Sequence, residues 1–189
     1  KGIPVILGEC DPEGCAACSW KRDPKYGYRN GTVYPSYTAS SFAKIYELAD
    51  KYKINLKGAL SWAFEFENQE WFAGFRELAS NGVDKPVLNV FRMFGMMDGK
   101  RVEVSGNPYS AEEVIEKGVI DKPDINALAS KNENNLTVMV WNYHDDDVLK
   151  EIADIEISIN GMNDGRVLLS HYRVDQKFSN SFSKWTELG

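Results

Sequence analysis

Three acidic residues follow directly on two apolar runs. Glu9 follows the run that ends at Gly8, and Glu65 and Glu67 follow the run LKGALSWAF at residues 56–64. Catalytic groups of α/β barrels lie at the C-terminal ends of the strands. Glycoside hydrolysis requires paired carboxylates, of which one attacks the sugar or activates water and the other protonates the leaving oxygen. Glu9 is the one convincing member of such a pair, and its alternative role is to cap the turn after a buried strand.

Trp62 lies just ahead of the second acidic group. An indole near acidic side chains offers a stacking floor and hydrogen-bond acceptors, which is typical of a site for a neutral sugar. The alternative is that Trp62 belongs to the core and that Glu65 and Glu67 face solvent. Both interpretations remain open on spacing alone.

The cysteines Cys10, Cys15 and Cys18 stand at C-x4-C-x2-C spacing. This spacing matches the first three ligands of a plant-type iron–sulfur site, but the required fourth cysteine is absent. The histidines His144 and His171 fall in what reads as another domain, so we expect no metal and no other cofactor. An odd count without a distant partner argues against a disulfide framework and leaves buried thiols or one local disulfide.

These residues need a scaffold, and the first half of the chain predicts a βαβ arrangement. Residues 2–8 are apolar without alternation, which favours a strand buried on both faces. Helical periodicity predicts a helix over residues 36–52, and a second apolar strand follows over residues 56–64. Another amphipathic helix is predicted over residues 87–97, with Pro86 near its first position.

The second half has shorter apolar segments separated by Asn, Asp and Gly turns, which is typical of an antiparallel sandwich. The predicted strands are residues 100–104, 125–131, 135–143, 154–159 and 166–174. We therefore expect a boundary near residues 98–100. Residues before this boundary would form the βαβ part of the chain, and residues after it the antiparallel sandwich.

Composition limits the class of partner. The 189 residues are 43% apolar and 26% charged, and they carry a net charge of -6. No Lys/Arg cluster exceeds a pair, so we expect neither nucleic acid nor an anionic membrane as partner. No apolar run reaches the length of a membrane span, and no signal peptide pattern opens the chain. The expected partner is small or neutral, and the compartment stays open.

Five motifs occur in a fixed order: PVILGECDPEGCAAC, YPSYTASSFAKIYELADKY, GALSWAFEFENQEWFAGF, NGVDKPVLNVFRMFGMM and HYRVDQKFSNSFSKWTELG. Together they resemble the later part of glycoside hydrolase family 39, the β-xylosidases, over essentially the whole chain. The resemblance implies an α/β plus β fold, in which the last two β/α units of a (β/α)8 TIM barrel precede an antiparallel β-sandwich. Residues 1–99 would be the C-terminal portion of the barrel, and residues 100–189 the β-sandwich domain, truncated at its C-terminus.

The resemblance also implies residue roles. Glu9 corresponds to the nucleophile of a retaining enzyme, and Trp62 to the aromatic residue that lines the subsite for the non-reducing xylose. Glu67 resembles the family's sugar-binding acid, but Asn68 stands where a second Glu is usual. Glu65 is also displaced from the pattern. The Asn-Glu-Pro motif that carries the family's general acid/base does not occur in this sequence.

We therefore expect a piece of a retaining enzyme that removes xylose from the non-reducing ends of xylo-oligosaccharides by double displacement. Without the acid/base, the piece alone should be inactive. Unpaired strand edges predict self-association or association with the remainder of the parent barrel. Two alternatives stay open: a carbohydrate-binding or scaffold module with Trp141, Tyr143 and Tyr172 as its platform, or a retaining barrel glycosidase for another sugar, such as iduronate or arabinose.

Overall fold

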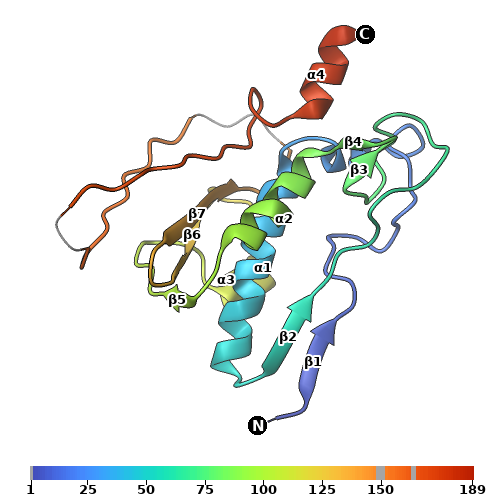
Figure 1. Cartoon of the computed structure of the whole chain (residues 1–189). Helices are drawn as coiled ribbons and strands as arrows, with labels where there is room; N and C mark the ends of the chain where they lie inside the picture. Colours follow the sequence, from blue (N-terminus) through green and yellow to red (C-terminus); the bar gives the residue numbers. More distant parts are fainter. Residues whose placement is uncertain (1, 148–151, 163–164) are drawn as a thin grey trace.

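The computed structural model of the chain describes residues 2–147, 152–162 and 165–189. Its elements are β1 (Pro4–Leu7), the 3-10 helix η1 (Pro24–Arg29), α1 (Val33–Lys51), β2 (Asn55–Ala59), β3 (Ala79–Ser80), β4 (Val83–Asp84), α2 (Pro86–Met96), β5 (Lys100–Val102), α3 (Ala111–Lys117), β6 (Asp124–Lys131), β7 (Leu136–Tyr143) and α4 (Ser181–Leu188) (Figure 1).

The predicted βαβ unit is confirmed. Strands β1 and β2 pair in parallel, with α1 as the connection between them. The three elements lie beside one another in Figure 1. Helix α1 begins at Val33, earlier than predicted, with Pro35 in its first turn, where a missing N–H costs no helical hydrogen bond. Strand β2 ends at Ala59, so Trp62 lies in the loop beyond it rather than in the strand.

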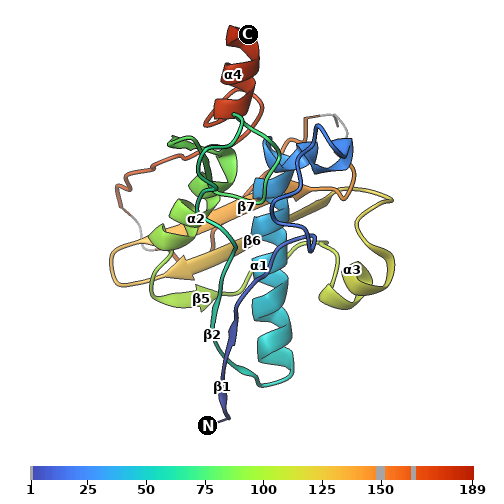
Figure 2. The ribbon, with the colours of Figure 1, turned by 90° about the vertical axis from the view of Figure 1, so that its right-hand side faces the viewer.

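The apolar core lies between α1, α2 and the sheet formed by β5, β6 and β7. Its buried members include Ala39 of α1, Val90 of α2, and Met139 and Trp141 of β7. Figure 2 shows α1 crossing in front of β6 and β7. Close packing of these side chains fixes α1 against the sheet, and α1 in turn carries the two parallel strands.

A buried carboxylate ties the same elements together. Asp124, at the start of β6, is fully buried and accepts hydrogen bonds from Ser40 Oγ (3.2 Å) and from the Tyr109 backbone N–H (3.1 Å). The indole Nε1 of Trp141 lies 3.5 Å from the same carboxylate. Residues from both sides of the predicted 98–100 boundary thus share polar and apolar contacts.

The prediction for the second half is confirmed for three strands and wrong for two. Strands β5, β6 and β7 form an antiparallel sheet in that order. Residues 154–159 and 166–174 contain no strand, and the side chain of Leu168 is 94% exposed. Alternating apolar residues become a strand only when a neighbour supplies backbone hydrogen bonds and a face to bury. The described part of residues 100–189 contains one three-stranded sheet rather than two packed sheets.

Besides the 3-10 helix η1, two short α-helices were not predicted. Helix α3 begins with a capping box, in which Ser110 Oγ accepts from the Glu113 N–H and the Glu113 carboxylate accepts from the Ser110 N–H. Helix α4 begins at the N-cap Asn180. The ring of Trp185 on α4 packs 5.3 Å from that of Phe72, which joins α4 to the loop after β2.

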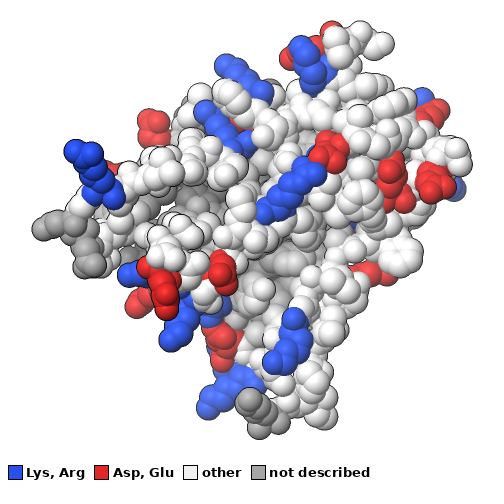
Figure 3. All heavy atoms as spheres, in the orientation of Figure 1, with Lys and Arg blue, Asp and Glu red and all other residues white. Residues whose placement is uncertain are grey.

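The charged side chains are mixed in sign. On the face drawn in Figure 3, Lys and Arg alternate with Asp and Glu, without a continuous basic area. Among the described residues, no helix is both long and apolar enough to cross a membrane.

Candidate active site

Glu9 lies just beyond the C-terminal end of β1, where a parallel strand presents its following loop. Its side chain is 55% exposed, and its Oε2 forms an ion pair with Nη2 of Arg76. Arg76 lies in the loop after β2, and its side chain is only 3% exposed. One carboxylate oxygen of Glu9 is therefore held by a buried guanidinium while the side chain remains accessible from solvent.

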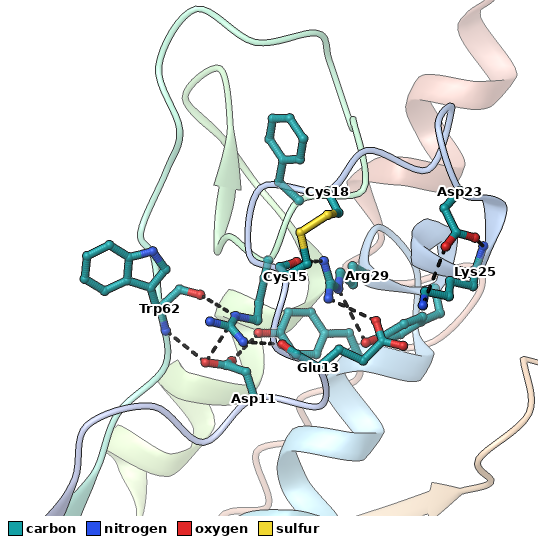
Figure 4. A network of polar contacts seen from close by, with 12 residues as sticks. Asp11, Glu13, Cys15, Cys18, Asp23, Lys25, Arg29 and Trp62 are labelled. Carbon is teal, nitrogen blue, oxygen red and sulfur yellow. Dashed lines mark hydrogen bonds and ion pairs between the residues drawn. A yellow bond between two sulfur atoms is a disulfide. The ribbon is translucent and has the colours of Figure 1, made fainter.

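Asp11 is the buried carboxylate of the site. Its Oδ1 accepts hydrogen bonds from Tyr34 Oη (2.7 Å) and Ser61 Oγ (2.6 Å), and its Oδ2 accepts one from the Trp62 backbone N–H at 3.1 Å (Figure 4). Oδ2 also lies 3.5 Å from Arg76 Nε. Sequence reasoning missed Asp11, although a second acid so close to Glu9 was a readable signal.

Trp62 stands in the loop after β2, with its side chain 52% exposed. Its backbone carbonyl accepts from Arg76 Nε at 3.1 Å, and its backbone N–H donates to Asp11. The same guanidinium thus contacts Glu9 and the backbone of Trp62. The structure brings these two predicted site residues together through Arg76, which the sequence reasoning did not single out.

The other two predicted site residues lie differently. Glu65 is half-buried, and its Oε1 accepts from the Gly82 N–H at 2.7 Å, so it holds the turn between β3 and β4. Glu67 is exposed in the loop. Glu65 therefore has a structural role in this turn, whereas the carboxylate of Glu67 faces solvent.

Tyr34 is kept protonated by its surroundings. Burial and the neighbouring Asp11 carboxylate raise the pKa of Tyr34 far above its ordinary value. The protonated hydroxyl of Tyr34 can therefore donate its hydrogen bond to Asp11. Burial likewise raises the pKa of Tyr28 to about 12.

The cysteine loop contains one local disulfide, between Cys15 and Cys18, whose Cα atoms are 5.5 Å apart. Cys10 is a free thiol, and burial raises its pKa. Of the two alternatives left by the sequence, the local disulfide is therefore the one found for Cys15 and Cys18, and Cys10 stays a thiol. In the part of the chain that the structure describes, no three His, Cys, Asp or Glu side chains come together as a metal site.

The loop also holds a second buried arginine. Arg29, from η1, donates through Nη1 to the Cys15 carbonyl at 2.8 Å, and its Nη2 lies 3.0 Å from Glu13 Oε2 (Figure 4). A guanidinium supplies five donors in a plane, which suits it to join several acceptors at once. The polypeptide between Glu13 and Cys18 is thereby fixed to η1.

A hollow of about 420 Å³ opens beside Glu9, within the size range of ligand sites. Its lining includes Glu9, Cys10 and Asp11 from the loop after β1, Tyr37 and Lys44 from α1, and Tyr143 from β7. A second hollow, of about 480 Å³, lies between α1, α2 and the sheet and contains none of the predicted site residues. The first is the one that the carboxylate of Glu9 can reach.

An accessible carboxylate after a parallel strand, linked through Arg76 to the backbone of a loop that carries an exposed indole, is compatible with a glycosidase site. The chain matches the family model for glycosyl hydrolases family 39 over residues 19–189. It belongs to that family, which supports a glycoside hydrolase with a TIM-barrel-related fold. Glu9 lies ahead of the matched residues. Comparisons with curated proteins and with solved structures found no match.

Proposed function

We propose that the chain is the C-terminal part of a retaining β-xylosidase in which Glu9 is the nucleophile. The observation that carries this proposal is the ion pair between the accessible Glu9 and the buried Arg76, at the carboxyl end of a parallel strand. In this proposal, residues 1–99 supply two β/α units of the barrel, and residues 100–189 contribute the three-stranded sheet that packs on α1 and α2.

The chemistry is a double displacement. The carboxylate of Glu9 attacks the anomeric carbon of xylose, and the bond to the leaving oxygen breaks as a second carboxyl group donates its proton. Water, deprotonated by that second group, then cleaves the glycosyl ester and regenerates Glu9. The two carboxyl groups must be about 5–5.5 Å apart in such an enzyme.

Asp11 is poorly suited to be the second carboxyl group. Its oxygens already accept three hydrogen bonds, from Tyr34, Ser61 and Trp62, and Arg76 lies beside it. A general acid must point its own O–H at the leaving oxygen and later take a proton from water at the same place, so one of its oxygens must face the substrate. We assign the general acid/base to a part of the parent enzyme outside this sequence, so the chain alone should not turn over ordinary xylosides.

Trp62 is proposed to stack on the terminal xylose, which its exposed indole supports. Glu67 is the better candidate for accepting a sugar hydroxyl, because Glu65 is engaged with Gly82. Iduronate or arabinose remains an alternative substrate sugar. The binding-module alternative loses two of its three platform residues, because Trp141 and Tyr143 are buried in the core.

Exposed apolar residues in and next to β1 and β2 indicate that another protein surface covers these strands. Ile3, Ile6 and Leu60 are large apolar side chains that remain exposed. Exposed apolar faces of this kind mark contacts with other protein surfaces. We propose that the remaining strands of the parent barrel cover them, with self-association as the alternative when those strands are absent.

Covalent trapping tests the proposal in the parent enzyme. A 2-deoxy-2-fluoro-β-xyloside with a dinitrophenolate leaving group needs no proton on departure and forms a slowly hydrolysed glycosyl ester. Peptide mapping should find the sugar on Glu9, and Glu9→Gln should remove both the label and turnover. Glu70→Gln is the matched control, since Glu70 is an exposed carboxylate paired with Lys21.

Two results would contradict the proposal: a label on another carboxylate, or parental turnover by Glu9→Gln. The same reagent series with iduronyl and arabinosyl analogues identifies the sugar. Faster trapping by either analogue than by the xyloside would select the alternative substrate while leaving the role of Glu9 intact.

A further inference from the structure

The disulfide loop has no role in the proposed chemistry, yet it contacts the residue that holds Glu9. The carbonyl of Glu13 accepts from Arg76 Nη1, and the carbonyl of Ala16 accepts from the Arg76 backbone N–H at 2.9 Å. The Cys15 carbonyl, between them, binds Arg29. Backbone carbonyls in and next to the Cys15–Cys18 segment therefore accept hydrogen bonds from both buried arginines, Arg29 and Arg76.

Arg76 extends from this loop to the candidate active site. Its Nη2 pairs with Glu9, its Nε donates to the Trp62 carbonyl at 3.1 Å, and Asp11 lies at 3.5 Å. A buried guanidinium must satisfy its donors inside the protein, so each of these acceptors helps to fix its position. Movement of the loop at Glu13 would move Arg76, and with it Glu9 and Trp62.

We propose that Arg76 is a positioning residue for Glu9, that the Cys15–Cys18 disulfide keeps Arg76 in place, and that reducing this disulfide lowers the rate of glycosylation. The inference rests on the proposed role of Glu9. Cys15 is exposed, so a dithiol can reach the bond. Dithiothreitol supplies two electrons and two protons, the S–S bond becomes two thiols, and dithiothreitol becomes its cyclic disulfide. Oxidised glutathione reverses the change.

The expected effect is larger on the chemical step than on sugar binding, because Arg76 pairs with the carboxylate of Glu9 but contacts only the backbone of Trp62. A displacement of catalytic groups by about 1 Å costs on the order of 100-fold in rate. Arg76→Lys keeps the charge but loses the planar set of donors. It should lower kcat on the order of 100-fold while KM changes less than about threefold. Cys15→Ser/Cys18→Ser, which keeps the loop's carbonyls, should lower kcat roughly tenfold.

The test uses the parent enzyme, with kcat and KM measured for an aryl xyloside and melting temperature followed in parallel. Dithiothreitol should reduce wild-type kcat to the level of Cys15→Ser/Cys18→Ser, and oxidised glutathione should restore it. Cys10→Ser is the matched control, because it removes the free thiol and should respond to dithiothreitol like the wild type. Asp124→Asn controls for general destabilisation, since it perturbs the core away from Arg76 and should leave kcat unchanged.

Failure of this inference is distinguishable from failure of the proposed function. Parental turnover by Glu9→Gln would overturn the proposed nucleophile. An inactive Glu9→Gln, together with a parental kcat for Arg76→Lys or a wild-type kcat that ignores dithiothreitol, would overturn only the positioning role. A loss of kcat by Asp124→Asn equal to that of Arg76→Lys would also overturn it, because stability alone would then account for the effect.

Discussion

Lys85 and Glu77 form a buried ion pair. Glu77 follows Arg76 in the segment after β2, and Lys85 follows β4. Both side chains are almost completely buried, and Lys85 Nζ lies 3.9 Å from Glu77 Oε1. Lys85 Nζ also donates to the Phe75 carbonyl at 2.9 Å. The other carboxylate oxygen of Glu77 accepts from the Phe66 N–H at 3.0 Å. The loop from Phe66 to Phe75 is therefore held at both ends by one ion pair.

Lys85→Met should destabilise the chain strongly. Methionine fills a similar volume, but it leaves the Glu77 carboxylate buried without its cation and the Phe75 carbonyl without its donor. Removing one partner of a buried pair costs about 3–5 kcal/mol. For a domain of this size that loss lowers the melting temperature by about 2–4 °C per kcal/mol, or roughly 6–20 °C in total. Lys85→Met/Glu77→Leu removes both charges and should recover part of the loss, although the Phe75 carbonyl and the Phe66 N–H remain without their partners.

The pH dependence has a definite sign. Burial raises the pKa of Glu77 above its unfolded value, so protonation of this carboxyl favours the folded state as the pH falls. Burial lowers the pKa of Lys85 from its ordinary value of 10.5 to about 7. The folded state therefore gains stability as the pH rises from about 7 towards 10.5. In Lys85→Met only the Glu77 contribution remains, and its destabilisation should be smaller at about pH 5 than at about pH 8.

Urea unfolding of the chain and of the two variants, followed by circular dichroism, measures these differences. The Lys85→Met midpoint should fall by more than about 1 M urea. A loss below about 1 kcal/mol would refute the argument, because it would mean that water or another group compensates the Glu77 carboxylate. A double variant as unstable as the single one would refute it as well, since the cost would then come from packing.

Two further substitutions test the core and one tight approach. Asp124→Ala should cost about 3 kcal/mol in urea unfolding, because it leaves Ser40 and the Trp141 indole without their buried acceptor; a loss under about 0.5 kcal/mol would contradict this. Gly99→Ala should cost at least about 2 kcal/mol by the same assay, because φ is +89° and the added Cβ would overlap the Lys131 carbonyl; unchanged stability would show that β5 can shift.

The elements that could be predicted are those whose evidence lies within one stretch of chain. The βαβ unit follows from two apolar runs and one helical periodicity, and strands β5 to β7 follow from alternation between turns. Helix α3 could also have been predicted, because Ser110 and Glu113 stand at capping-box spacing. Residues 154–159 and 166–174 show the same alternation, but a strand also needs a partner, which no local pattern specifies.

The candidate site could be predicted only in part for the same reason. Glu9 follows one apolar run and Trp62 lies near the end of the other, so both could be assigned to strand ends from the sequence. Nothing near Arg76 in the sequence marks it as their common partner, because Glu9 lies 67 residues away from it. Strand β2 was predicted to continue to residue 64, but it ends at Ala59, after which the N–H of Trp62 bonds to Asp11 instead of a strand.

The polar contacts also explain how so short a sheet can hold two site residues in register. Strands β1 and β2 pair from Pro4 to Leu7, and the pairing is irregular between Val5 and Ile6, so the ladder alone defines the loops beyond it poorly. Asp11 and Arg76 each contact both loops, and they also contact each other. Residues that share partners in this way are energetically coupled. Replacing either Asp11 or Arg76 should therefore also remove much of the stabilisation that the other gives to the two loops. The geometry of the site depends on both side chains together.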